Sequence, residues 1–246
     1  MTKVCVISGA ASGIGRATLL LFCSRGYACL GIDRDRTANE RLMSELDEAS
    51  RGRVRLLEMD LVAEDGPDAD AIRGLGDGRI ELTLVNNLGG SRGNAGDTWE
   101  EFAEVLAFNL KPMHTLTRAC VEVMKENEYG RIVNVASVAA RKPLREVEPA
   151  YAAAKAAVVG LSRQLALELA PDGVLVNAVC PGVVATERIE ERWARRGDDV
   201  NRKVLRGIPL GRLGRPEEVA EAIWFLGSGS TYSTGSIVDV NGGMSL

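Results

Sequence analysis

The pentapeptide YAAAK places a phenol, Tyr151, four residues before an ammonium, Lys155. Alanine is the strongest helix former, and residues four apart on a helix lie on the same face, so the two side chains are expected to be neighbours. A free tyrosine titrates at about pH 10, and a nearby ammonium favours the phenolate. The pair therefore predicts a phenol of lowered pKa that acts as a general acid and base.

A serine stands at the end of the apolar run that precedes this pair. In RIVNVASVAA, Ser137 follows the run and is separated from Tyr151 by the length of a loop. Because open α/β sheets bind ligands at the carboxyl ends of their strands, Ser137 can hold a carbonyl or hydroxyl oxygen beside the phenol. The alternative is a serine that only caps a turn.

Hydrolytic and metal chemistry are not indicated. No GxSxG motif surrounds Ser137, and the single histidine, His114, lies in a helical stretch without partners at ligand spacing. His114 is therefore interpreted as a structural or surface residue, and no metal site is predicted.

A glycine-rich turn follows the first apolar run. The segment SGAASGIG contains Gly9, Gly13 and Gly15, with Ser12 and Ile14 between them, and it leads into a helix. Glycines allow a tight turn, and backbone N–H groups at a helix N-terminus bind phosphate. A P-loop would require Lys and then Ser or Thr after the last glycine, whereas the chain continues with Arg-Ala. The turn predicts dinucleotide binding, with a purely structural turn as the alternative.

Asp33 ends the second apolar run, at the place where dinucleotide-binding folds carry an acid for the adenosine ribose. A carboxylate suits two free ribose hydroxyls and repels the extra phosphate of NADP. We therefore expect NAD, with NADP possible because Arg34 and Arg36 stand close by and can pair with that phosphate.

The elements that must position these residues alternate along the chain. Short apolar runs at 4–7, 28–32, 54–59, 82–85, 132–135, 174–179 and 237–240 predict strands, and helical patterns lie near 14–25, 37–50, 64–74, 98–127, 150–170 and 216–227. Most of the runs lack polar alternation, which is typical of parallel strands covered on both faces. The sequence predicts one α/β domain over 1–246, with a doubly wound parallel sheet.

The bulk composition fits a soluble globular protein. Hydrophobic residues make up 46% and charged residues 26% of the 246 positions, which predicts a sizeable core rather than disorder. A net charge of −4 gives no basic surface for nucleic acid or an anionic membrane. The five cysteines form no CxxC spacing, and no apolar segment has the length of a signal peptide core or a membrane span. These features predict reduced thiols and a cytoplasmic location.

Taken together, these motifs resemble the short-chain dehydrogenase/reductase family, in its branch of chains of about this length. The resemblance covers essentially the whole chain and is carried by the SGAASGIG turn, Asp60-Leu61, Asn86-Asn87-Leu88-Gly89, Asn109, Ser137, Tyr151 with Lys155, and PGVVAT at 181–186. It implies a Rossmann fold and hydride transfer between a nicotinamide ring and a secondary alcohol or ketone.

The resemblance also implies roles for single residues. Tyr151 would exchange the proton and Ser137 would orient the substrate oxygen, while Lys155 would lower the tyrosine pKa and hold the nicotinamide ribose. Asn109 would anchor a water in a proton relay to Lys155. The remaining cofactor contacts implied are Asp60 and Leu61 at the adenine, Val184 and Thr186 at the carboxamide, and Asn87, Gly89, Pro181 and Gly182 along the groove.

Two positions depart from the family pattern. Ser8 stands where threonine is usual and keeps the hydroxyl. Leu88 stands where alanine is usual and places a larger side chain beside the cofactor, so it bears on the shape of the pocket.

The segments expected to form the substrate pocket are 89–98, 138–149 and 189–206. Arg141, Lys142 and Arg145 lie in the second segment, where they either read an anionic substrate or form solvated surface. The region 187–210 is rich in arginine and interrupts the alternation of strands and helices, which indicates a solvated helical insertion or a movable cover over the substrate.

The preferred interpretation is an NAD-dependent dehydrogenase of a secondary alcohol. An NADPH-dependent 3-oxoacyl thioester reductase is the alternative, and a non-catalytic regulator that senses NAD is a third. Small residues after Tyr151, such as Ala152, Ala156 and Gly160, allow close helix packing; similar proteins pair these helices, so a homotetramer is expected.

Overall fold

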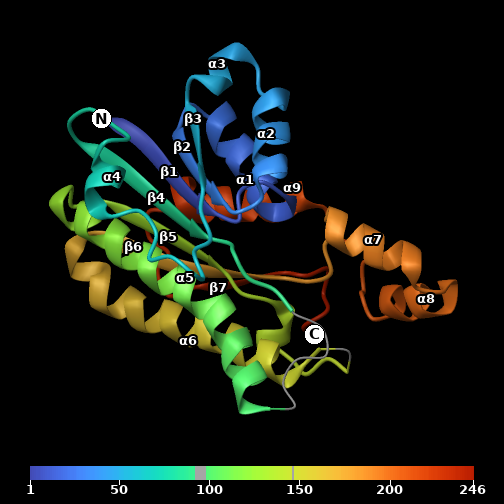
Figure 1. Ribbon diagram of the computed structural model, residues 1–246. Helices are drawn as coiled ribbons and strands as arrows, with labels where there is room; N and C mark the ends of the chain where they lie inside the picture. Colours follow the sequence, from blue (N-terminus) through green and yellow to red (C-terminus); the bar gives the residue numbers. More distant parts are fainter. Residues whose placement is uncertain (92–97, 146) are drawn as a thin grey trace.

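A computed structural model describes residues 1–91, 98–145 and 147–246. Within them a seven-stranded sheet has the order β3-β2-β1-β4-β5-β6-β7 (Figure 1), and every neighbouring pair is parallel. The strands are β1 Thr2–Ser8, β2 Ala28–Asp33, β3 Val54–Glu58, β4 Ile80–Asn86, β5 Gly130–Val135, β6 Val174–Pro181 and β7 Ile237–Val240. The predicted doubly wound parallel sheet is confirmed. The strand order reverses between β1 and β4, which opens a crevice at their carboxyl ends.

Helices cover both faces of the sheet. Helices α1 Gly13–Ser24, α2 Arg36–Glu45 and α9 Pro216–Trp224 lie on one side, and α4 Ala69–Arg73, α5 Trp99–Glu126 and α6 Pro149–Leu169 lie on the other (Figure 1). In β1, Val4 and Val6 belong to one buried cluster, whereas Cys5 and Ile7 belong to another. Both faces of this strand are therefore apolar, which explains the continuous apolar runs in the sequence.

Two predicted helices are shorter than expected. The helix predicted over 37–50 is split into α2 and α3 Glu48–Arg51, because the side chain of Asp47 accepts a hydrogen bond from Ser50 N at 2.7 Å and starts a new helix. The helix predicted over 64–74 is restricted to α4. Gly66 and Pro67 precede it, and the side chain of Asp68 caps its first turn.

The segment 187–210 forms two short helices, α7 Glu187–Arg195 and α8 Asp198–Arg206, joined by a tight connection. They extend past the edge of the sheet as an arm (Figure 1), and α7 contains no buried residue. The segment is therefore helical, as one of the two interpretations of the sequence expects.

The cysteines are buried free thiols, as predicted. Across the described ranges, no helix is both long enough and apolar enough to cross a bilayer.

Candidate active site

A cleft with a volume of about 790 Å³ lies at the carboxyl ends of the central strands. The predicted site residues that line it are Gly9, Ser12, Gly13, Ile14, Asp33, Asp60, Leu61, Asn87, Gly89, Ser137, Tyr151, Lys155, Pro181, Gly182, Val184 and Thr186. Gly15 and Asn109 lie behind its wall, where both are buried. The fold thus brings residues from all parts of the chain to one crevice.

The glycine-rich turn connects β1 to α1 and is anchored on both sides. Asn87 Nδ2, after β4, donates to the carbonyls of Ser8 and Gly9, each at 3.0 Å. The Ser8 hydroxyl accepts from the N–H groups of Asn87 and Leu88 at 3.1 and 3.0 Å. These bonds fix the ends of β1 and β4 to each other, and they show why a hydroxyl at position 8 preserves the turn.

Gly15 allows the close approach of the helix to the turn. A Cβ atom at this position would overlap the carbonyl oxygen of Gly9 and would lie 2.6 Å from Asn87 Nδ2. The turn therefore has the compact form in which backbone N–H groups at the N-terminus of α1 face the cleft, and it fits the pyrophosphate of a dinucleotide.

Asp33 ends β2, and its carboxylate organises the backbone around it. Oδ2 accepts from Ala11 N and Oδ1 from Asp35 N, both at 3.1 Å. The side chain also lines the cleft. The negative charge predicted for this position is therefore held at the edge of the crevice, next to the glycine-rich turn.

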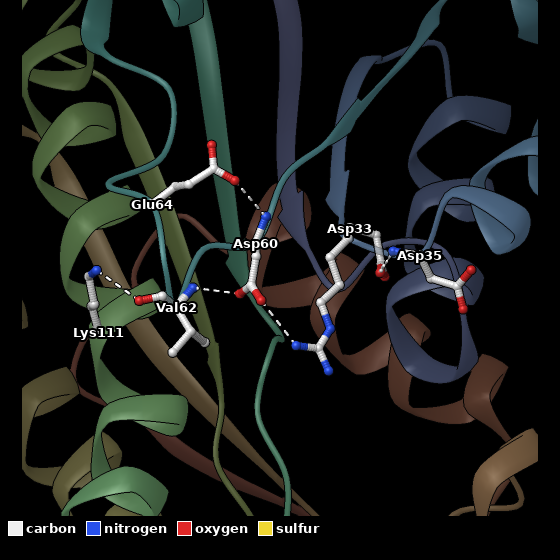
Figure 2. Close-up of polar contacts among 7 residues, drawn as sticks. Asp33, Asp35, Asp60, Val62, Glu64 and Lys111 are labelled. Atoms are coloured by element: carbon white, nitrogen blue, oxygen red, sulfur yellow. Dashed lines mark hydrogen bonds and ion pairs between the residues drawn. The ribbon is translucent and has the colours of Figure 1, made fainter.

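Asp60 lies beside Asp33, after β3 (Figure 2). Its carboxylate accepts from Val62 N at 2.9 Å and pairs with the Arg34 guanidinium at 3.0 Å. The backbone hydrogen bond from Val62, followed by the bond and charge of Arg34, holds the pKa of Asp60 below its ordinary value. Arg34 is thus directed to Asp60, and Arg36 pairs with Glu40 on the surface at 2.9 Å.

Tyr151 lies half-buried at the start of α6, and it faces Ser137 across the cleft. Both side chains line the cleft, and the Ser137 oxygen accepts from Ala139 N at 3.1 Å. The predicted pairing of serine and tyrosine in space is therefore present.

The expected direction of the Tyr151 pKa is wrong for this structure. Removal of the phenol from water raises its pKa above the ordinary value, and this outweighs the lowering by the Ser137 hydrogen bond and by the charge of Arg188. The sequence predicts the neighbouring cation but cannot show how deeply the phenol is buried.

Lys155 lies one turn along α6, as predicted, with 3% of its surface exposed. Its ammonium is 5.8 Å from the Tyr151 ring centroid and donates to the carbonyl of Val135 at 2.9 Å. Burial lowers the pKa of Lys155 from 10.5 to about 8, with a smaller opposite effect of Cys180. The ammonium is therefore held behind the phenol by a strand carbonyl.

Asn109 lies on α5, and hydrogen bonds to the loop after β4 connect it to the site. Its amide donates to the carbonyls of Val105 and Gly90 and accepts from Gly90 N, at 2.9, 3.1 and 3.0 Å. A Cβ atom on Gly89 would lie 2.6 Å from Asn109 Oδ1 and 2.9 Å from Lys155 Nζ, so the absence of a side chain there lets all three meet. The side chain of Leu88 lines the cleft nearby and also packs against the core.

The end of β6 forms the opposite wall of the cleft. Pro181 ends the strand, and Thr186 N donates to Val184 O at 2.8 Å in the turn before α7. The methyl group of Thr186 would lie 2.8 Å from a Cβ on Gly13. This wall therefore closes against the glycine-rich turn.

The predicted substrate segments contribute unequally. Val138, Leu144 and Val147 line the cleft from the second segment, and Ile189 and Arg192 are among the lining residues of the third. Residues 92–97 of the first segment and Glu146 of the second lie outside the described residues. Arg141 pairs with Asp239 at 3.1 Å, and neither it nor Lys142 nor Arg145 lines the cleft.

Sequence reasoning missed the contacts made by the first turn of α7. Glu187 accepts from Gly13 N at 3.2 Å and pairs with Arg41 at 3.9 Å, so a carboxylate occupies the N-terminus of α1. Arg188 donates to the carbonyl of Ser91, after β4. The only signal in the sequence is that both residues follow the PGVVAT motif directly, and the orientation of α7 decides where they point.

The donor set of the cleft fits a nicotinamide dinucleotide. The glycine turn provides backbone N–H groups, Asp33 provides acceptors for ribose hydroxyls, and Lys155 provides a buried ammonium. Within the part of the chain that is described, no group of three or more His, Cys, Asp or Glu side chains could hold a metal ion.

Comparisons with known proteins agree with this geometry. The sequence model of a family described as enoyl-(acyl carrier protein) reductase matches residues 9–245. The chain is similar to 3-oxoacyl-[acyl-carrier-protein] reductase FabG of Thermotoga maritima, with 36% identity over 98% of this chain and 97% of the relative.

Comparison with solved structures agrees with these sequence matches. A short-chain dehydrogenase/reductase family oxidoreductase from Burkholderia thailandensis has a TM-score of 0.86 and 31% identity, covering 99% of this chain and 93% of that chain. A 3-oxoacyl-[acyl-carrier protein] reductase from Brucella melitensis has a TM-score of 0.84 and 33% identity, covering 100% and 91%. The chain therefore belongs to the short-chain dehydrogenase/reductase family, and it is an oxidoreductase that acts on CH–OH groups with NAD or NADP.

Proposed function

We propose that this chain reduces 3-oxoacyl thioesters to 3-hydroxyacyl thioesters, with NADPH as the reductant. The observation that carries the substrate class is the similarity to 3-oxoacyl-[acyl-carrier-protein] reductases over nearly the full length of both chains. The sequence alone favours an NAD-dependent dehydrogenase of a secondary alcohol, and these relatives favour the alternative, the thioester reductase.

In the proposed reaction, the bound nicotinamide supplies the hydride that forms the new C–H bond. The Ser137 hydroxyl holds the oxo oxygen, and the Tyr151 phenol, which lines the cleft together with Ser137, gives that oxygen its proton. Lys155 holds the nicotinamide ribose and stabilises the resulting phenolate. Asn109 anchors a water through which the proton of Tyr151 is replaced.

A second candidate is an NAD-dependent dehydrogenase of a secondary alcohol, and Asp33 favours it. Its carboxylate stands at the end of β2, where an acid accepts hydrogen bonds from the ribose of NAD and repels the additional phosphate of NADP. Arg34 is directed to Asp60, and Arg36 is paired with Glu40, so neither is aimed at such a phosphate.

Reduced-cofactor absorbance separates the two candidates. The protein is assayed with acetoacetyl-CoA and either NADPH or NADH, and in the reverse direction with a panel of secondary alcohols and NAD or NADP. The proposed reductase consumes NADPH with the thioester. Oxidation of simple alcohols with NAD, without thioester reduction, would establish the second candidate instead.

We further propose that α7 covers the substrate, because it lines the cleft while its outer face is exposed. A cytoplasmic homotetramer remains our proposal for the assembly. The free buried cysteines support the cytoplasmic location. Leu161 and Leu167 support the assembly, because they are 42% and 75% exposed on α6. Light scattering of the purified protein tests the tetramer, and a monomeric mass would contradict it.

A further inference from the structure

Arg188 joins the arm to the rim of the cleft. Its Nη2 atom donates to the carbonyl of Ser91, and its Nη1 atom would lie 2.9 Å from a Cβ on Gly90. The side chain thus crosses from the first turn of α7 to the loop after β4. It also lines the cleft that contains Tyr151.

The charge of Arg188 acts on the reacting end of the cleft. Arg188 and Tyr151 line the same cleft, and the charge of Arg188 acts against the burial that raises the pKa of the phenol. Glu148 itself accepts from the Ser91 hydroxyl at 2.8 Å. Among the described carboxylates, none forms an ion pair with Arg188, whereas Arg41 and Arg195 are both paired. A positive charge therefore faces the substrate space without a carboxylate bound to it.

The chemistry of a guanidinium narrows what it can bind there. It has only donors, in a planar fork that suits two oxygen lone pairs, and it is always charged. A 3-oxoacyl group carries a second oxygen on C1, two carbons from the reacting carbonyl. A simple secondary alcohol or ketone has no oxygen at that place.

We propose that Arg188 is a specificity-determining residue that donates hydrogen bonds to the C1 oxygen of a 3-oxoacyl substrate, in exchange for its bond to the Ser91 carbonyl. The proposal rests on the proposed function. It assigns to α7 a direct contact with the acyl group, and it applies to a thioester carbonyl or to the carboxylate of a free 3-oxo acid.

The test compares Arg188→Gln and Arg188→Lys with Arg195→Gln, a change on the same helix at a residue that does not line the cleft. Substrates are acetoacetyl-CoA and acetoacetate, and cofactor affinity is measured separately by nicotinamide fluorescence. Loss of a charge-assisted hydrogen bond predicts that Arg188→Gln lowers kcat/KM about ten- to hundredfold, mainly through KM. Arg188→Lys restores part of the loss, and cofactor affinity and unfolding temperature stay at the wild-type values. Arg195→Gln leaves kcat/KM within about twofold, as expected for a surface charge.

If Arg188→Gln loses kcat/KM with acetoacetate alone, Arg188 binds a free carboxylate. If kcat/KM also falls with acetoacetyl-CoA, Arg188 binds the acyl carbonyl. Both results support the contact with the C1 oxygen. Wild-type kcat/KM in Arg188→Gln, or an equal loss in Arg195→Gln, would overturn it. If the wild-type protein reduces neither substrate but oxidises simple alcohols, the proposed function fails and the inference fails with it.

Discussion

The buried ammonium of Lys155 leads to a quantitative prediction for stability. Because burial lowers the pKa of Lys155 from 10.5 to about 8, the folded protein holds its proton less tightly than the unfolded chain. At pH 7 both states carry the charge, and the folded state bears its full desolvation cost of about 3 kcal/mol. As the pH rises from about 8 towards 10.5, the folded Lys155 loses its proton first and the cost disappears.

Lys155→Met removes this cost and also removes the hydrogen bond to Val135 O, which is worth about 1 kcal/mol. The variant is therefore expected to be more stable than the wild type by about 2 kcal/mol at pH 7, and the difference shrinks to about zero near pH 10. Urea unfolding at the two pH values, without cofactor, measures both quantities.

Lys111→Met is the matched control. Lys111 also donates to a backbone carbonyl, that of Val62 at 2.8 Å, but its side chain is 35% exposed. The same urea experiments should show no stabilisation of Lys111→Met at pH 7, because an ammonium that stays in contact with water bears no large desolvation cost. If Lys155→Met is no more stable at pH 7, or if its difference does not change with pH, the reasoning about the buried charge is refuted.

Three further predictions concern the cofactor groove. Asp33→Asn removes the charge that repels the extra phosphate of NADP, so binding of NADPH relative to NADH should strengthen by about tenfold. An unchanged ratio of the two dissociation constants would contradict the placement of the ribose at Asp33. Glu187→Gln removes the negative charge that competes with the cofactor for Gly13 N, so fluorescence titration should show cofactor binding about two- to fivefold more tightly. The control Glu190→Gln should leave cofactor affinity unchanged. Gly15→Ala forces the turn apart at the Gly9 carbonyl, so calorimetry should show cofactor affinity reduced at least about tenfold, and wild-type affinity would mean that the turn does not bind the pyrophosphate.

Much of the fold and site follows from where polar residues stand relative to apolar runs. Gly9, Asp33, Asn87 and Ser137 each follow a run, and parallel strands bring their carboxyl ends to one edge, so their meeting in one cleft is predictable. The YAAAK spacing predicts the neighbourhood of tyrosine and lysine for the same kind of local reason.

The features that the sequence could not predict depend on how deeply a side chain is buried and on how a helix is oriented. The raised pKa of Tyr151 reflects how far its hydroxyl is removed from water, which no spacing reveals. The contact of Arg188 with Ser91 depends on the angle at which α7 leaves the body. The break between α2 and α3 has a local signal in the sequence, because Asp47 stands three residues before Ser50, the spacing of an N-cap. The helical pattern that continues past Asp47 hides this signal.

The most direct test of the mechanism is Tyr151→Phe. Nicotinamide binding is measured by fluorescence and turnover by absorbance, with acetoacetyl-CoA and with the alcohol panel. Loss of the proton donor should reduce kcat by about a thousandfold, while the dissociation constant of the cofactor stays within about twofold. A variant that keeps wild-type turnover would contradict the assignment of Tyr151, and a wild-type protein that binds cofactor but turns over no substrate would indicate a sensor rather than an enzyme.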